Sequence, residues 1–271
     1  MYQFLWLVPL GFLVGTFGTL IGAGGGFILV PVLLLLYPDK SPETITAISL
    51  AVVFFNSLSG SFAYAKMKKT DYKSGIIFAL ATLPGSILGS LTTSLIPRDI
   101  FDMLFGILLL AGAVYLFINP RNKNRHKKAS GKQITRRVTD IDGIVYTFSY
   151  SPLAGIVISL LVGYLSSLLG IGGGIIHVPV MIQMLNFPVH LATATSHFVL
   201  AAMSLSGSVV HLVTGVLSSG FMQTAGLTMG ALFGAQLGAL LSKKLKGDWI
   251  IKSLALALGL AGIRIFIMAF I

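Results

Sequence analysis

The sequence contains no cysteine and few charged residues. The lack of cysteine excludes disulfide bonds, thiol redox chemistry and cysteine-ligated zinc. Charged residues occupy 10% of the 271 positions, whereas a soluble globular domain carries about 25%. Hydrophobic residues occupy 55% of positions, the mean hydropathy is +0.91, and several apolar runs approach the ~20 residues that cross a bilayer. The composition therefore predicts an all-α polytopic membrane protein without a soluble catalytic domain.

Acidic residues are scarce, and each falls in a predicted loop or at the end of a predicted span. They are Asp39, Glu43, Asp71, Asp99, Asp102, Asp140, Asp142 and Asp248. Since no carboxylate lies deep in a span, a Na⁺ site or a carboxylate proton relay is not expected. Ligand spacings typical of a metal site are also lacking, so the sequence predicts no metal and no cofactor.

Positive charge, in contrast, is abundant and concentrated between the apolar runs. The net charge is +11, and eight of the 19 lysines and arginines lie within residues 119–137. Further lysine clusters occupy residues 66–73 and 243–252. The positive-inside rule makes all three clusters cytoplasmic anchors, with contact to anionic lipid as the alternative. No nucleic-acid partner is expected.

The chain carries a weak internal repeat with an offset of 148 residues. Residues 22–31 read GAGGGFILVP and residues 170–179 read GIGGGIIHVP. The sequence A-x-S, a group of small residues and a G-x-x-x-G pair follow each stretch in the same order. The chain is therefore expected to consist of an N-terminal transmembrane repeat (1–118), a basic cytoplasmic linker (119–151) and a C-terminal transmembrane repeat (152–271).

Each repeat is predicted to contain one interrupted segment and three simple spans. The predicted segments are 4–37, 44–65, 73–96 and 99–118 in the first half, and 152–185, 190–213, 220–242 and 249–270 in the second. The triple glycines split each interrupted segment, which either re-enters or is a broken full-length helix. With the linker cytoplasmic, the lysines after 242 stay cytoplasmic only if 152–185 re-enters. This parity favours two repeats of inverted topology, a plan common in secondary transporters.

The glycine triplets, Gly24, Gly25 and Gly26 and their counterparts Gly172, Gly173 and Gly174, are candidate anion sites. A short apolar helix is expected to start after each triplet, at Phe27 and at Ile175. Its free N–H groups and positive dipole end suit an anion. The alternative is that the glycines only allow helices to cross closely.

Polar residues in the spans are candidates to line the path of such an anion. The main ones are Ser49, Asn56, His177, Ser196 and His197. The alternative for each is a side chain bonded to its own or a neighbouring helix. His190 and His211 lie near predicted span ends and are interpreted as interfacial.

These motifs resemble the sulfite exporter TauE/SafE family, also called the toluene-sulfonate uptake permease family. The resemblance rests on the twin G-x-G-G-G-x-x-x-V-P stretches, the A-x-S sequences and the G-x-x-x-G pairs. It implies transport of sulfur-containing oxyanions or organosulfonates across the bacterial cytoplasmic membrane. It also places the six glycines at the centre of the site, with Ser49 and Ser196 beside them. Two positions break the symmetry, because Asn56 faces Met203 and Leu50 faces His197 in the repeat.

The sequence thus favours a secondary transporter whose partners are a small anion (sulfite, thiosulfate or a sulfonate) and the lipid bilayer. Coupling to a proton or another ion is left open, as are direction and oligomeric state. A passive anion channel is the first alternative. An intramembrane hydrolase using Ser196 and His197 is disfavoured, because adjacent helical residues point about 100° apart and a G-x-S-x-G elbow is lacking.

Overall fold

The computed structural model describes residues 5–118, 133–245 and 247–268. In the N-terminal half the helices are α1 (Leu7–Ile21), α2 (Gly26–Leu36), α3 (Pro42–Lys66), α4 (Tyr72–Thr93) and α5 (Arg98–Ile118). In the C-terminal half they are α6 (Pro152–Leu169), α7 (Gly174–Gln183), α8 (Val189–Val213), the 3-10 helix η2 (Val216–Gly220), α9 (Phe221–Lys244) and α10 (Gly247–Met268). Both interrupted segments are broken at their glycine triplets, as predicted. The short helices start one residue earlier than expected, at Gly26 and Gly174.

Five of the described helical stretches are long and apolar enough to cross a membrane. They are Pro42–Lys66, Tyr72–Thr93, Pro152–Leu169, Val189–Val213 and Val216–Lys244. Helices α1, α2 and α7 are apolar but shorter. The described helices thus have the make-up of an all-α polytopic membrane protein.

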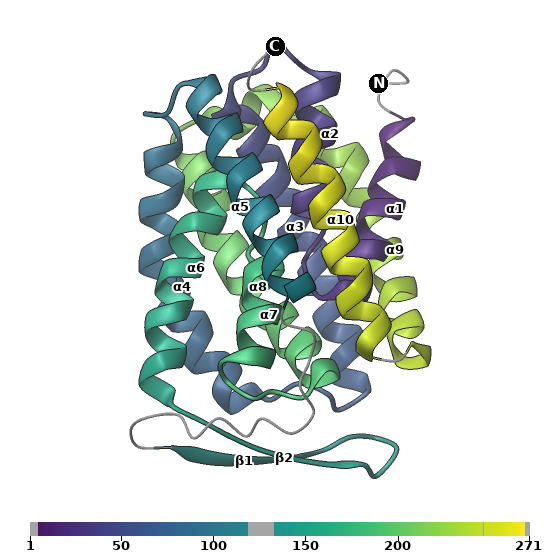
Figure 1. Ribbon diagram of the computed structural model, residues 1–271. Coiled ribbons are helices and arrows are strands. Elements are labelled where there is room, and N and C mark those ends of the chain that lie inside the picture. Colours follow the sequence, from purple (N-terminus) through teal and green to yellow (C-terminus); the bar gives the residue numbers. More distant parts are fainter. Residues whose placement is uncertain (1–4, 119–132, 246, 269–271) are drawn as a thin grey trace.

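The broken segments do not run straight through the bundle. In Figure 1, α1 and α2 both lie between the first glycine loop and the end of the bundle where α1 begins. Helices α6 and α7 both lie between the second loop and the opposite end, beside the hairpin formed by β1 and β2. The two glycine loops therefore approach the middle of the bundle from opposite ends.

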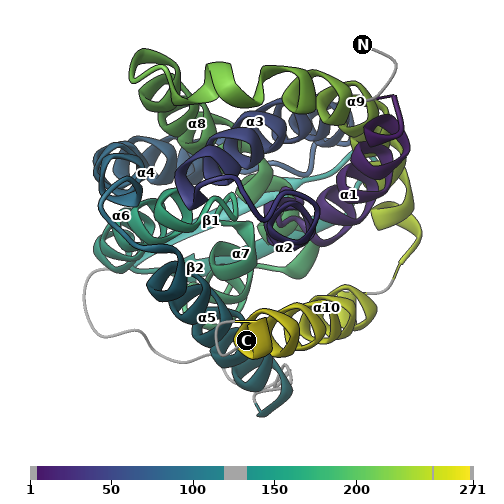
Figure 2. The same ribbon diagram turned by 90° about the horizontal axis from the view of Figure 1, so that it is seen from above.

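Helices of the two halves pack against each other in pairs. Helix α1 packs along α9, α4 along α6, α3 along α8 and α5 along α10, an arrangement visible from above in Figure 2. Glycines line the contacts of α1 with α9 and of α4 with α6. A Cβ on Gly234 of α9 would overlap the carbonyl oxygen of Phe12, and a Cβ on Gly89 of α4 would overlap the carbonyl oxygen of Tyr164. The G-x-x-x-G pairs thus allow close helix crossing, as small residues do in membranes.

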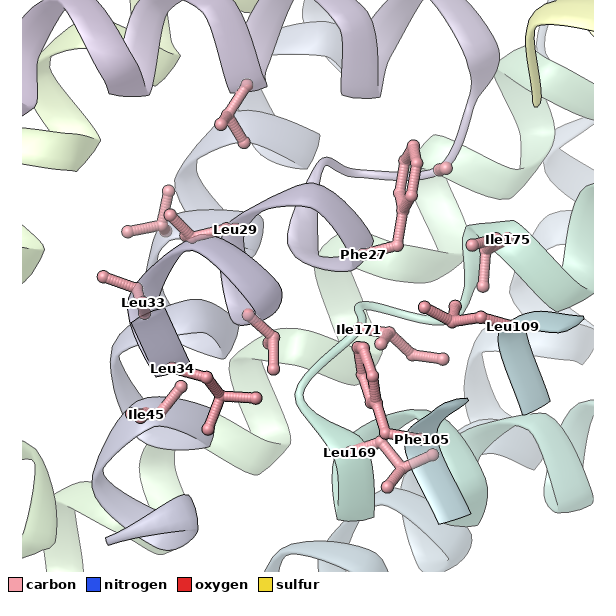
Figure 3. Close-up of a cluster of buried hydrophobic side chains, with 14 of the residues drawn as sticks. Phe27, Leu29, Leu33, Leu34, Ile45, Phe105, Leu109, Leu169, Ile171 and Ile175 are labelled. Atoms are coloured by element: carbon pink, nitrogen blue, oxygen red, sulfur yellow. The ribbon is translucent and has the colours of Figure 1, made fainter. Parts of the chain in front are cut away.

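An apolar cluster packs one side of the two loops. Phe27, Leu29 and Leu33 of α2 belong to one buried cluster with Ile171 and Ile175 from the second loop and α7, part of which Figure 3 shows. Burial of such side chains holds the first turn of α2 beside the second loop.

The linker contains a β-hairpin, which departs from the expected all-helical fold. Strand β1 (Ile134–Thr139) pairs antiparallel with β2 (Val145–Tyr150). Side chains alternate along the strands, so that Phe148 and Tyr150 turn toward the bundle and pack on Phe187. Residues 119–132 of the predicted linker lie outside the described residues.

Salt bridges tie the hairpin to the loops at this end of the bundle. Arg136 pairs with Asp71 at 2.8 Å, Lys69 with Asp140 at 4.0 Å and Lys243 with Asp142 at 3.0 Å. These pairs bring lysines or arginines from all three predicted basic clusters to one end of the molecule.

The Asp71 carboxylate sits in the turn before α4 and is almost fully buried. Burial alone would raise its pKa, but hydrogen bonds from Arg136 and Ser74 and the charge of Arg136 outweigh this effect. The pKa of Asp71 is therefore held below its usual value of 3.8, and the carboxylate is ionised at neutral pH.

Candidate functional site

The two glycine loops touch each other through their backbones. A Cβ placed on Gly26 would lie 2.6 Å from the carbonyl oxygen of Gly170. One placed on Gly174 would overlap the carbonyl oxygen of Gly22 and lie 2.5 Å from the Cα of Ala23. Only glycine fits at these two positions, and the space in front of each is filled by the opposite loop. Gly26 and Gly174 therefore allow the two loops to pack closely, which is the alternative role considered for the glycines.

The other four glycines of the triplets are needed for their backbone conformation. The φ angles of Gly24, Gly25, Gly172 and Gly173 are +75°, +87°, +77° and +80°. This is the left-handed region that side chains with a Cβ rarely adopt. All six glycines of the triplets are buried.

The first turns of α2 and α7 leave backbone N–H groups free. In α2 the first bonded amides are those of Ile28 and Leu29, which donate to Gly25 O. In α7 they are those of Ile176 and His177, which donate to Gly173 O. Three amides precede each of these pairs and find no acceptor within the described part of the chain: those of Gly25, Gly26 and Phe27, and those of Gly173, Gly174 and Ile175. Such helix ends favour negative charge.

Ser49 and Ser196, the two motif serines, bond across the repeat. Ser49 on α3 donates to the carbonyl oxygen of Gly170 at 2.6 Å, and Ser196 on α8 donates to that of Gly22 at 3.3 Å. A helix of each half thus holds the loop of the other half. Both hydroxyls were expected to face an anion, but in this structure each donates its hydrogen bond to a carbonyl oxygen of a loop.

Asn56 and His197 belong to a network under the first loop. Asn56 donates from Nδ2 to Gly24 O at 3.1 Å and accepts from the Thr19 hydroxyl at 3.3 Å. His197 Nε2 lies 3.1 Å from the same hydroxyl. Tyr64 donates to Thr19 O at 2.8 Å and lies 3.1 Å from the Ser242 hydroxyl. These side chains fasten the first loop to α3, α8 and α9.

His177 lies apart from this network. Its Nε2 is 3.3 Å from the Ser159 hydroxyl of α6, and its ring meets that of Phe78 edge-on. The structure therefore gathers Ser49, Asn56, Ser196 and His197 around the loops but turns His177 toward α4 and α6. Ser196 and His197 have separate partners, so their geometry does not support the hydrolase alternative.

Several polar residues around the loops were missed by sequence reasoning. His211 was interpreted as interfacial from its place near a span end, and the structure shows in addition that its side chain is fully buried within the protein. Thr19 and Ser167 occupy equivalent places one turn before the glycines, and only the repeat offset could have pointed to them. Among the described residues, no group of three or more histidines and carboxylates could hold a metal ion.

Comparison with known proteins identifies the family. The model of the family described as "Sulfite exporter TauE/SafE" matches residues 7–265, nearly the whole chain. The chain belongs to this family. "Probable membrane transporter protein YunE" of Bacillus subtilis is 37% identical over 269 residues, covering 97% of both chains. "Probable membrane transporter protein MJ0441" of Methanocaldococcus jannaschii is 29% identical, covering 97% of this chain and 96% of the relative. No solved structure matches the chain.

The TauE/SafE membership confirms the predicted resemblance. With its apolar helices, the protein is a multi-pass membrane transporter of this family. This assignment agrees with the prediction of a transporter rather than an enzyme.

Proposed function

We propose that this TauE/SafE protein is a secondary transporter of small sulfur-containing oxyanions or organosulfonates, the class of sulfite, thiosulfate and sulfonates. The observation that carries the proposal is the meeting of two glycine loops, each followed by a helix N-terminus whose first three amides find no acceptor among the described residues. An anion that leaves water loses its hydration, and the positive ends of two helix dipoles can replace part of it. Carboxylates are scarce in the described spans, which also favours an anion over a cation.

The same proposal includes two inverted repeats, 1–118 and 152–271, in a bacterial cytoplasmic membrane. Its support is that the two broken segments approach the centre from opposite ends (Figure 1) and that equivalent helices pair, α3 with α8 and α5 with α10. The hairpin end, where Lys69, Arg136 and Lys243 gather, would be cytoplasmic by the positive-inside rule. The segment 119–151 would then link the repeats on that side.

A carrier fits this site better than a passive channel. The two loops contact each other through backbone atoms, so the centre of the molecule is packed rather than open. Transport would require one half to move relative to the other, which is the alternating-access plan of inverted-repeat carriers.

Reconstitution into liposomes tests the proposal. Wild-type protein is expected to transport at least one anion of a panel of sulfite, thiosulfate, sulfate and a sulfonate, assayed with and without a pH gradient. Saturable flux and countertransport indicate a carrier, whereas flux that does not saturate indicates a channel. Absence of flux for every anion would contradict the proposal.

Glycine variants test the site itself. Gly25→Leu and Gly173→Leu are expected to abolish flux while the protein still inserts, which is checked by membrane extraction and size-exclusion chromatography. Gly259→Ala on α10 is the matched control, because its nearest neighbour outside its own helix would be 3.8 Å away. Wild-type flux from the loop variants would refute the assignment.

A further inference from the structure

A group of buried polar side chains beside the second loop has no hydrogen-bond partner. Its members are Thr46 of α3, Ser90 of α4, Ser166 and Ser167 of α6, and His211 of α8. Each is at most 1% exposed. Their hydroxyl oxygens, and both ring nitrogens of His211, find no partner in the part of the chain that the structure describes. Four helices therefore bring unused donors into one region.

Two of these hydroxyls converge on Gly207 of α8. A Cβ on Gly207 would lie 2.9 Å from both Ser90 Oγ and Leu50 Cδ1 and 3.4 Å from Ser167 Oγ. His211 follows Gly207 by four residues, so that both lie on the same face of α8. Because Gly207 has no side chain, the hydroxyls of α4 and α6 can approach α8 closely, on the face of α8 that carries His211.

The remaining hydroxyls connect this region to the second glycine loop. A Cβ on Gly173 would lie 3.1 Å from Ser166 Oγ, and one on Gly170 would lie 3.1 Å from Thr46 Oγ1. Ser90 and His211 lie near the C-terminal ends of their helices, and Thr46 lies near the start of α3. The group therefore extends from the loop toward the end of the bundle away from the hairpin (Figure 1).

Buried hydroxyls without a described partner also occur elsewhere in these helices, among them those of Ser57, Ser61 and Ser208, but the present group converges on Gly207 and the second loop. Buried serines and threonines normally bond to the preceding turn of their own helix, as Thr93 does to Gly89 O at 3.0 Å and Thr193 to Val189 O at 3.0 Å. A buried polar group without a partner destabilises the protein, and binding of a ligand or water is one of the few reasons for keeping such a group. Several such groups in one place indicate a site that is completed by something other than the protein.

We propose that Ser90, Ser167 and His211 bind the transported oxyanion, with Ser166 and Thr46 connecting this site to the second glycine loop. The inference rests on the proposed function. Hydroxyls and a neutral imidazole can each donate a hydrogen bond to an anion oxygen. Donors from three helices suit a sulfur oxyanion, which presents several oxygens in different directions. The site lies on the side of the loops away from the hairpin, which is the outer side in the proposed topology.

The test compares anion binding and protein stability in the same variants. Ser90→Ala, Ser167→Ala and the double variant are purified in detergent, and the Kd for sulfite and thiosulfate is measured by calorimetry. The double variant is expected to bind about tenfold more weakly or worse, because two donors are lost. Its Tm without anion is expected to equal or exceed that of the wild type, because the removed hydroxyls have no protein partner. Ser94→Ala, at the exposed end of α4, is the control and should change neither value.

Each result decides the proposal. An unchanged Kd in the double variant would overturn it, and so would a lowered Tm without anion, since that would make the hydroxyls structural. The single variants are judged by the same two criteria if the double variant does not fold. Flux by wild-type liposomes combined with an unchanged Kd would refute this site and leave the proposed function standing. A wild-type protein that neither binds nor transports any anion of the panel would refute both.

Discussion

The two glycine loops have the same backbone, but their polar surroundings differ. The equivalent positions, 147 or 148 residues apart, are Thr19 and Ser167, Leu50 and His197, Asn56 and Met203, and Tyr64 and His211. Under the first loop Thr19 bonds to Asn56 and His197, and its carbonyl accepts from Tyr64. Beside the second loop Ser167 finds no partner among the described residues, since Leu50 and Met203 stand where the histidine and the asparagine would be.

This difference shows how a duplicated fold can separate two tasks. The first loop gains stability from the bonds that Thr19, Asn56 and Tyr64 form around it, although the nearby Ser57 hydroxyl has no partner among the described residues. The half with unpaired groups keeps donors available, which lowers stability but allows binding. A ligand site in a symmetric scaffold can therefore be located by asking which copy of each polar residue has lost its partner.

The largest expected effect comes from breaking what the two loops share. Gly174→Ala would place a methyl group against the carbonyl oxygen of Gly22 and 2.5 Å from the Cα of Ala23. Backbone cannot move aside as a flexible side chain can, so we expect a loss above about 4 kcal/mol or no folded protein. Thermal unfolding in detergent measures it. Gly259→Ala is expected to keep the wild-type Tm or raise it slightly, and equal Tm values for the two variants would contradict the loop contact.

A smaller effect is expected where the turns of the two halves differ. Asp71, in the turn between α3 and α4, is buried and paired with Arg136, whereas the corresponding Ser219 in η2 is exposed. Asp71→Asn is expected to lower the free energy of unfolding by about 3 kcal/mol at pH 7. Ser219→Ala is expected to change it by less than about 0.5 kcal/mol.

The pH dependence of this pair follows from the pKa of Asp71. Because the folded pKa lies below the usual 3.8, the pair stabilises the protein above pH 3.8, and this stability is lost as the pH falls through the lower folded value. The wild type is therefore expected to lose more stability between pH 5 and pH 3 than Asp71→Asn, measured as the change in Tm. Parallel pH profiles would show that the pair does not stabilise the fold.

The smallest effect is expected at Asn56 and Met203, which are equivalent positions in the two halves. Asn56→Leu would leave Gly24 O without its donor and remove one partner of Thr19, at about 2 kcal/mol. Met203→Leu conserves volume and removes no hydrogen bond, so we expect less than about 1.5 kcal/mol. Equal losses in urea or thermal unfolding would mean that the two networks contribute alike.

The sequence predicted the breaks in both interrupted segments, because glycine triplets in an apolar run leave few other conformations. It also named Ser49, Asn56, His177, Ser196 and His197 as candidates to line the path of an anion, and the structure places all of them except His177 beside the loops. It did not predict their partners, since Ser49 bonds to a carbonyl 121 residues away and such contacts depend on how distant helices pack. The burial of His211 was not predicted for the same reason, because the distance of a residue from a span end does not reveal how neighbouring helices cover its side chain.

The hairpin was missed for a different reason. The stretches ITRRVT and VYTFSY do alternate between outward and inward side chains, but the eight lysines and arginines of residues 119–137 suggested only a polar connection. Pairing of Arg136 with Asp71, far away in sequence, turns one of those charges inward. The basic residues thus act as part of the packing as well as of the charge pattern.

The crossed serine bonds have a consequence for how the molecule matures. The carbonyl of Gly22 receives its hydroxyl donor from α8, and that of Gly170 from α3. A nascent first half that leaves the ribosome cannot finish its own loop and must wait for α8 to be inserted. The loops at the centre of the molecule are therefore the last part to assemble. Neither half can complete its loop alone, and the linker keeps the two halves together in one chain.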